Sequence, residues 1–492
     1  MPHPSTFEQA AAVLYHRGPG RMVPDLSRIT ALTGLLGDPQ LAYPTVHVTG
    51  TNGKGSTVRM AASLCNAAGI SAGTYTSPHL QTVRERLTVA GQYITERQFA
   101  VIYDDVAPLA DLVDEQARAS HGDDADMVTF FELLTAMAFW WFADAPVDVG
   151  IIEVGMGGKW DATNVVRGDV AVLAPIDIDH RELGSTPAEV AVEKSGIIKA
   201  GSRVVSAAQP DDVAAVIDRA IDEVGATIWR EGSDFAVVDH QVAVGGQLLT
   251  LRVGDRIIDD IVVPLYGGHQ RSNAALALAS FAALTESSFA SMDDDVIRHG
   301  FAAVTVPGRL EVIHRDPTII IDGAHNPHGA RAAAAALDAS FGFRDLILVV
   351  ACLDDKDIDG IVSAYQPLAS HVIAAAAPSE RGASAQVMYD AALAVWGNTG
   401  VVIEQAADIK QACDMAQAVA RPGDGILVTG SLYSAGAARD LYLPLVVSAD
   451  DDAVIWQPDD EDTGDTGDTG DELIQPLPDY ITDDELYSED DA

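Results

Sequence analysis

The sequence predicts an α/β protein in which two parallel-sheet domains follow one another along the chain. From Thr45 onward, short β-branched runs alternate with longer segments of helical period, and a second series of the same kind begins after Pro307. Between them, Ala226–Pro264 alternates polar and apolar residues around Gly-Gly and Gly-Asp turns. Strands separated by helices favour a parallel sheet, whereas Ala226–Pro264 favours an antiparallel hairpin or meander appended to the first sheet.

The first domain is predicted to span residues 1–297. Its expected strands are Thr45–Thr49, Ile70–Tyr75, Val147–Val154, Val170–Ile176 and Arg203–Ala207. Its expected helices are Lys54–Ala68, Met127–Phe142, Pro187–Lys199, Asp211–Val224 and His269–Leu284, the last of which closes the domain. The apolar run LLTAMAFWWFA, Leu133–Ala143, is too short to span a bilayer and therefore predicts a buried helix.

The second domain is predicted over residues 298–448, with a smaller parallel sheet. Its expected strands are Thr318–Ile321, Leu346–Ala351, Val372–Ala376, Val401–Glu404 and Ile426–Thr429. The acidic stretch Ser291–Asp295 and the VPGR segment Val306–Arg309 bracket the predicted hinge. Residues 449–492 are rich in Asp, Glu, Gly and Thr, and they predict a disordered acidic tail.

The net charge of −43 at pH 7 is unevenly distributed along the 492 residues. Asp450–Ala492 holds 18 acidic residues and no Lys or Arg, so the other 449 residues carry −25. Sequence-independent binding of nucleic acid depends on Lys and Arg neutralising phosphates, and membrane surfaces attract basic amphipathic faces. We therefore expect neither nucleic acid nor a membrane as a partner.

The cysteines and the N-terminus favour a cytoplasmic protein. Cys65, Cys352 and Cys413 lie far apart in apolar contexts, which argues against a disulfide framework or a CxxC metal site. The N-terminal segment MPHPSTFEQAAAVLYHRGPGR has no basic start followed by an apolar run, so we expect no signal peptide. We also expect the protein to be a monomer.

A glycine-rich turn that contains a lysine, GTNGKGS, follows the first expected strand and precedes a helix. Glycines allow a tight turn, so backbone N–H groups and the helix N-terminus point at one spot that suits a triphosphate. Lys54 adds positive charge, and the Ser56 hydroxyl can reach a Mg²⁺ ion. A plain βα turn would not need a lysine between two glycines. The residues of this turn predicted to contact ATP are Asn52, Gly53, Lys54, Gly55 and Ser56.

Polar residues also follow other expected strands. Glu153 ends the apolar run VGIIEV, at the edge of a parallel sheet where ligands bind in open α/β folds, and Mg²⁺ prefers such oxygen ligands. Ser77 follows the second strand and could reach the same crevice, although a Ser-Pro turn explains it nearly as well. His180 follows another strand, but a lone histidine is more often structural than a ligand.

Nine motifs accompany the turn in a fixed order: TSPHL, ERL, EVGMGGKWDATN, IDIDH, EKSGIIK, GGHQRSNAALA, PGRLE, DGAHNPHG and DDKD. Together with the compressed phosphate loop, this set closely resembles the folylpolyglutamate synthase/dihydrofolate synthase family of the Mur ligase superfamily, from about Arg21 to about Ala435. The resemblance implies a P-loop ATPase domain followed by a Rossmann-like domain that serves the glutamate side.

The resemblance also implies the metal site and a modified lysine. It places two Mg²⁺ ions on Ser56, Ser77, Glu153 and His180, and it adds K⁺ as a further candidate ion. Composition alone describes Lys194 as a helix-surface lysine after Glu193. The family implies instead a carbamylated Lys194, whose oxygens would face the metals where an ammonium group would repel them.

Residues for the far side of the ATP site and for the amino-acid substrate come from the same resemblance. The far side of ATP is assigned to Asn273, Arg309 and Asp322, from QxxN, PGR and DGAHN. Because Arg309 lies at the predicted hinge, domain closure could bring its planar guanidinium onto the phosphates. His325 and Ser431 are candidates for contact with the incoming glutamate, and the catalytic set is Lys54, Lys194 and His325.

The implied activity is ATP-dependent amide formation through an acyl phosphate. The γ-phosphoryl group of ATP moves to a folate or dihydropteroate carboxylate, and the amine of L-glutamate then displaces phosphate. The chain is expected to act as a folylpolyglutamate synthase and also as a dihydrofolate synthase. Three alternatives remain open at this point: a Mur-type ligase of peptidoglycan precursors, a P-loop ATPase without ligase activity, and a protein that acts mainly through interactions of its acidic tail.

Overall fold

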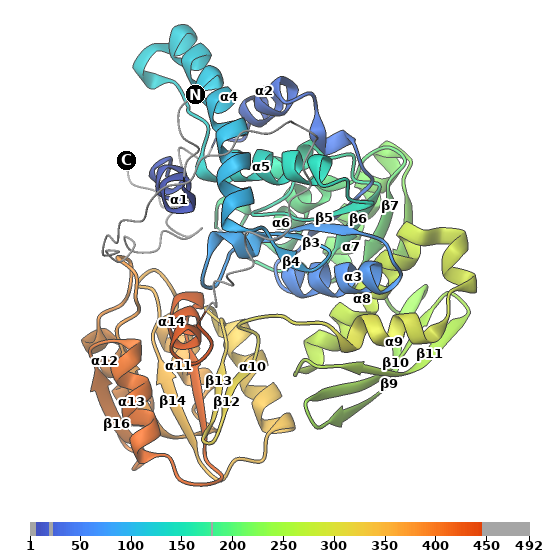
Figure 1. The fold of residues 1–492 in the computed structure, drawn as a ribbon. Helices are drawn as coiled ribbons and strands as arrows, with labels where there is room; N and C mark the ends of the chain where they lie inside the picture. The colour runs from blue at the N-terminus through green and yellow to red at the C-terminus, as the bar shows by residue number, and fades with distance from the viewer. Residues whose placement is uncertain (1–5, 19–22, 179–180, 445–492) are drawn as a thin grey trace, which may run out of the picture.

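The computed structural model describes residues 6–18, 23–178 and 181–444, which form two α/β domains, each built on its own sheet (Figure 1). The expected α/β class is confirmed, with the larger sheet in the first domain and the smaller one in the second. The acidic tail at 449–492 and His180 lie outside the described residues.

The first sheet has eight strands in the order β4-β3-β2-β5-β1-β6-β7-β8. In this order, each strand from β2 through β5, β1, β6 and β7 to β8 pairs in parallel with the next. At the edge, β3 pairs antiparallel with β2 and with β4. The strands are β1 Thr45–Thr49, β2 Ala72–Tyr75, β3 Leu87–Val89, β4 Gln92–Tyr93, β5 Val149–Glu153, β6 Val170–Leu173, β7 Arg203–Ser206 and β8 Thr227–Arg230. The central strands β1 and β5 are buried along their whole length, as expected for a parallel sheet covered on both faces.

Helices cover both faces of this sheet. One face packs against α3 and α8, and the other packs against α4 and α5 at one side and α6 and α7 at the other. The helices of this domain are α1 Phe7–His16, α2 Ser27–Leu35, α3 Lys54–Ala67, α4 Glu96–His121, α5 Phe130–Asp144, α6 Pro187–Lys194, α7 Asp211–Val224, α8 Gly268–Thr285 and α9 Asp294–Ala302. The apolar run at Leu133–Ala143 lies inside α5 and is largely buried, as predicted.

The stretch predicted as an antiparallel appendage is divided in the structure. Its first strand, β8, continues the main sheet in parallel. The following strands, β9 Phe235–Ala243, β10 Gly246–Val253 and β11 Arg256–Val263, form a separate antiparallel sheet that packs on α8 and α9. The meander prediction is therefore confirmed for three strands, and its attachment to the first sheet is wrong, because it buries its apolar side against helices.

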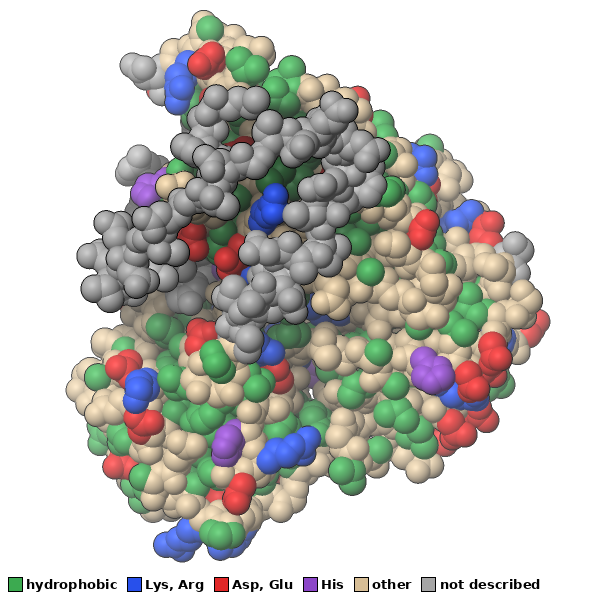
Figure 2. Space-filling model, in the orientation of Figure 1, with side chains coloured by type: hydrophobic (Ala, Val, Ile, Leu, Met, Phe, Trp, Pro, Cys, Tyr) green, Lys and Arg blue, Asp and Glu red, His purple; other side chains and the backbone are tan. Residues whose placement is uncertain are grey.

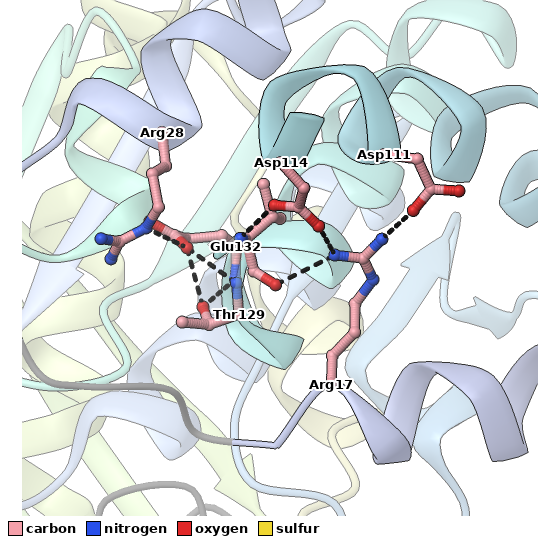
Figure 3. A network of polar contacts seen from close by, with 7 residues as sticks. Arg17, Arg28, Asp111, Asp114, Thr129 and Glu132 are labelled. Carbon is pink, nitrogen blue, oxygen red and sulfur yellow. Dashed lines mark hydrogen bonds and ion pairs between the residues drawn. The ribbon is translucent and has the colours of Figure 1, made fainter. Parts of the chain in front are cut away.

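Ion pairs between arginines and the carboxylates of α4 and α5 fix the N-terminal helices to the domain (Figure 3). Arg17, at the end of α1, donates to Asp114 at 2.8 Å and to Asp111 at 2.6 Å. Arg28, in α2, donates to both oxygens of Glu132 at 3.0 and 3.1 Å. Because Glu132 also accepts from Thr129 at the start of α5, the second pair joins a helix cap to α2.

The second sheet has six strands in the order β12-β13-β17-β14-β15-β16, and only the β12–β13 pair is antiparallel. Helices α10, α11 and α12 cover one face, and α13 and α14 cover the other. The strands are β12 Glu311–Arg315, β13 Thr318–Ile321, β14 Leu346–Val350, β15 Ala369–Ala375, β16 Val402–Ala406 and β17 Gly425–Thr429. The helices are α10 Pro327–Ser340, α11 Ile358–Ala364, α12 Ala385–Trp396, α13 Ile409–Val419 and α14 Leu432–Tyr442.

The domain boundary stays a prediction. The boundary between residues 297 and 298 falls within α9, and α9 packs on α3 and β11 of the first domain. Across the gap between the sheets, Tyr266 contacts Phe341 with ring centroids 4.5 Å apart.

On the face shown in Figure 2, acidic and basic side chains are interspersed over both domains. Within the described residues, no helix is long and apolar enough to cross a membrane.

Candidate active site

The phosphate loop joins β1 to α3 at the carboxyl edge of the first sheet. Gly50 and Gly53 have φ angles of +146° and +89°, a region that favours glycine. A Cβ on Gly50 would lie 2.7 Å from the Cβ of Ala174, and one on Gly53 would lie 2.4 Å from Oδ1 of Asn273. The loop is therefore packed between the end of β6 and α8, and it places Asn273 directly against the predicted phosphate site.

Two lysines converge on the main chain of this loop. The Nζ atoms of Lys54 and Lys194 donate to the carbonyl oxygen of Gly50 at 3.0 and 2.9 Å. Lys194 lies at the end of α6 and is only 1% exposed, so it is not the surface lysine that composition suggests. The end of α6 also packs closely on a glycine turn, since a Cβ on Gly158 would lie 2.9 Å from the backbone carbonyl oxygen of Lys194.

Glu153 is buried beside the start of α3. It is 4% exposed, and its Oε2 accepts a hydrogen bond from the backbone N–H of Ser77 at 3.2 Å. A Cβ on Gly55 would lie 3.3 Å from the same oxygen, so the glycine lets the carboxylate approach the helix. Burial raises the pKa of Glu153 to about 7, against the lowering effect of Lys54, the Ser77 hydrogen bond, and the charges of Arg59 and Arg309.

These residues fit a divalent cation. Glu153 and Ser56 are both buried, Ser77 lies against Glu153, and carboxylate and hydroxyl oxygens are the ligands that Mg²⁺ prefers. Burial raises the pKa of Glu153 by disfavouring its charged form, and a bound cation would offset that cost. His180 lies outside the described residues, so its place in the set stays a prediction.

Magnesium affinity is expected to rise with pH through about 7. The carboxylate of Glu153 must lose its proton to bind a metal, and below its pKa of about 7 each pH unit costs up to about tenfold in affinity. Calorimetric titration of Mg²⁺ into the protein at about pH 6 and about pH 8 measures this difference. Glu153→Gln is the control and should bind weakly at both values.

The metal-free protein should show the opposite trend in stability. The pKa of Glu153 lies above its ordinary value of 4.5, so the folded state binds the proton more tightly than the unfolded state. The free energy of unfolding therefore falls as pH rises from about 4.5 to about 7, and Glu153→Gln removes that part of the slope.

Equal Mg²⁺ affinity on both sides of pH 7 in the wild-type protein would contradict the assignment of Glu153.

The second domain contributes Arg309 and Asp322 to the candidate site. Asp322, just beyond β13, is buried and accepts hydrogen bonds from the N–H groups of Leu310 at 3.0 Å and Ala324 at 2.9 Å. Burial raises the pKa of Asp322, and the Arg309 guanidinium is the strongest influence lowering it. The same guanidinium lowers the pKa of Glu153, so Arg309 acts electrostatically on carboxylates of both domains.

The two candidates for contact with glutamate lie in the second domain. His325 follows β13, and its Nδ1 lies 3.0 Å from the carbonyl oxygen of Gly323. Ser431 follows β17, is 1% exposed, and caps α14 by accepting from the N–H of Ser434 at 3.1 Å. Ser431 therefore has a structural task in this state, and its role toward glutamate stays a prediction.

Sequence reasoning did not single out two residues that shape the site. Arg59, on α3, lowers the pKa of Glu153 and so contributes positive charge beside this carboxylate. Asp161 is buried in the DATN segment and accepts from the N–H of Met156 at 2.9 Å and of Thr163 at 2.9 Å. It thereby holds the glycine turn after Glu153. The DATN motif can be recognised in the sequence, but only the fold shows that its Asp161 supports the turn after Glu153.

Comparison with known proteins identifies the family to which this chain is similar. Residues 308–432 match the family model of the Mur ligase glutamate ligase domain. The chain is 44% identical over 448 residues to the dihydrofolate synthase/folylpolyglutamate synthase of Mycobacterium tuberculosis, covering 86% of this chain and 91% of that protein. It is 34% identical over 412 residues to the Escherichia coli protein of the same name, covering 83% and 89%.

A solved structure leads to the same class. The Mycobacterium tuberculosis folylpolyglutamate synthase complexed with ADP superposes with a TM-score of 0.82 at 42% identity, covering 89% of this chain and 98% of that one. A phosphate loop, buried acidic and basic groups beside it and a Mur-type second domain define an ATP-binding ligase that forms C–N bonds. The chain belongs to the folylpolyglutamate synthase/dihydrofolate synthase family.

Proposed function

We propose that this ligase joins the amine of L-glutamate to a folate or dihydropteroate carboxylate at the expense of ATP, through an acyl phosphate. The observation that carries the proposal is the arrangement of Lys54, Lys194 and Glu153 at the edge of one sheet, facing the charge of Arg309 from the other domain. Phosphoryl transfer needs such charges in a site that excludes water, because catalysis comes from positioning and electrostatic stabilisation.

The first domain activates the acid. The N–H groups at the start of α3 and the Lys54 ammonium bind the phosphates of ATP, together with Asn52, Gly53, Gly55 and Ser56. Asn273, packed against Gly53, and Arg309 and Asp322 of the second domain contact the nucleotide from the far side. Arg309 supplies a fixed positive charge for the phosphoryl group as it moves, and Lys54 supplies the other.

The metal ions complete this half of the site. Two Mg²⁺ ions are held by Ser56, Ser77, Glu153 and His180 in the proposal, with K⁺ as a further ion. When bound, Mg²⁺ neutralises charge on the phosphates and on the group transferred. Lys194 is proposed as a carbamate. Its position fits, because the buried ammonium shares the Gly50 carbonyl with Lys54, and conversion to an anion relieves two adjacent positive charges.

The second domain supplies the amine. His325 and Ser431 are proposed to contact L-glutamate, whose amine attacks the carbonyl carbon of the acyl phosphate while the phosphate leaves. Positions at the ends of β13 and β17 place both residues on the carboxyl edge of the second sheet, where open α/β folds bind ligands. The protein is proposed to be a cytoplasmic monomer that uses both dihydropteroate and folates.

A substrate panel tests the proposal. ADP release and amide formation are measured after addition of L-glutamate with tetrahydrofolate, with dihydropteroate, or with UDP-muramyl acceptors. Amide product with both pterin acids supports the bifunctional assignment, and product with tetrahydrofolate alone restricts it to folylpolyglutamate synthesis. Product with the muramyl acceptor alone, or ATP hydrolysis that is indifferent to every acid and to glutamate, contradicts the proposal.

A further inference from the structure

The segment that follows β2 crosses from the metal site to the other domain. It begins with Ser77, which contacts Glu153, and it continues to Leu80 and Gln81. The Glu85 carboxylate fixes its backbone by accepting from the N–H groups of Leu80 at 2.9 Å and Gln81 at 2.7 Å. Glu85 is only 4% exposed, so these two hydrogen bonds are shielded from water.

The side chain of Gln81 bonds across the domain boundary with both ends of its amide. Its Nε2 donates to Oδ1 of Asp440 at 2.6 Å and to the carbonyl oxygen of Leu443 at 3.2 Å, both at the end of α14. Its Oε1 accepts from the guanidinium of Arg439. Since an arginine only donates and a carboxylate only accepts, these partners require an amide and would not be satisfied by Glu or Leu.

Arg439 continues this bridge to the loop that carries Arg309. Its Nε donates to both oxygens of Glu311 at 3.1 and 3.2 Å. Glu311 in turn accepts from the N–H of Gly308 at 2.9 Å, directly before Arg309. A continuous set of hydrogen bonds thus connects the segment that begins at Ser77 with the loop that brings the second domain's arginine to the phosphates.

Close packing accompanies the bridge. A Cβ on Gly436 of α14 would lie 2.2 Å from the carbonyl oxygen of Leu80, and one on Gly308 would lie 3.2 Å from the Leu80 side chain. Leu80 therefore fits between the hinge loop and α14 because both neighbours are glycines. The bridge and this contact together fix how the domains face one another on the side of the metal site.

We propose that Gln81 is a positioning residue that sets the register between the activating domain and the glutamate-binding domain. This inference rests on the proposed function. The acyl phosphate has two fates: the glutamate amine adds to its carbonyl carbon, or water does. In both cases the C–O bond to phosphate breaks and phosphate leaves, but water returns the original carboxylate. Gln81 favours the amine by holding the second domain in place.

The ratio of phosphate released to amide formed measures this role. Gln81→Leu should lower kcat/KM for L-glutamate by about 10²-fold, as expected for a misplacement of about 1 Å, and raise the ratio above that of the wild type. Because the ratio is a property of each turnover, it does not change when part of the sample is unfolded. In Q81E/D440N, the carboxylate accepts from Arg439 and from the new amide but cannot donate to the Leu443 carbonyl, so the ratio should return only part of the way to the wild-type value.

Gln98→Leu is the matched control. Gln98 is a glutamine of the same domain whose amide oxygen accepts from the N–H and hydroxyl of Thr95, in the cap of α4, without crossing the boundary. It should lose stability and keep the wild-type ratio. The inference is overturned if Gln81→Leu keeps the wild-type ratio, or if Gln98→Leu raises it equally. A wild-type protein that forms no amide would overturn the proposed function instead.

Discussion

Lys54→Met is expected to lower kcat/KM for ATP by about 10³-fold, because it removes a fixed positive charge from the site of phosphoryl transfer. The methionine keeps much of the side-chain volume, and the shape of the loop depends on Gly50 and Gly53 rather than on the ammonium. The loss should therefore be electrostatic. Steady-state kinetics with saturating folate and glutamate, together with calorimetric binding of ADP, measure it.

A second effect distinguishes loss of this charge from loss of folding. Lys54 is the strongest influence that lowers the pKa of Glu153, so Lys54→Met should raise that pKa further and move the pH dependence of Mg²⁺ binding to higher pH. The control is Lys410→Met, which removes an exposed lysine whose pair with Asp414 lies on α13 of the second domain. If Lys54→Met turned over at the wild-type rate, the positive charge of Lys54 would have no role in phosphoryl transfer.

Local patterns were sufficient for the elements whose signals are contained in their own sequence. The predicted bounds of β1 and α7 match the structure, and α8 differs from its prediction by one residue at each end. By contrast, α4 was not among the expected helices. It carries a Thr95 capping box at its start but contains Pro108, and proline normally interrupts a helix. Strands β3 and β4 have three and two residues, so their pairing with β2 is decided by the fold rather than by propensity.

The residues of the candidate site also divide into those that their own sequence predicts and those that only the fold places. The apolar run before Glu153 predicted a buried carboxylate at a strand end, and the structure places it there. Lys194 could not be assigned in this way, since its own helix has a charged neighbour in Glu193 and its Nζ is bound by the Gly50 carbonyl of a segment far away in the sequence. Charges that act over a distance, such as Arg59 on Glu153, have no local signature at all.

Removal of CO₂ is expected to inactivate the enzyme, as is Lys194→Ala, each by about 10²-fold or more, because the carbamate is proposed to supply oxygen beside the metals. Carbamylation joins the neutral amine nitrogen to the carbon of CO₂ and releases protons, so the modified fraction should rise with pH and with bicarbonate. Kinetic assays in degassed buffer, with bicarbonate then restored, measure this dependence.

Lys199 provides a stringent control because it is a second partly buried lysine of the same motif. Burial lowers the pKa of Lys199 to about 8, and its Nζ donates to the carbonyl oxygen of Asn164 at 2.7 Å and to that of Val166. It is therefore the alternative carbamylation site to exclude, although its Nζ already donates hydrogen bonds to two carbonyl oxygens. Isotopically labelled bicarbonate should give a carbamate carbon signal by NMR that is lost in Lys194→Ala and kept in Lys199→Ala. A signal that follows Lys199 instead would refute the assignment, because the anion would then lie away from the phosphate loop and could not face the metal site.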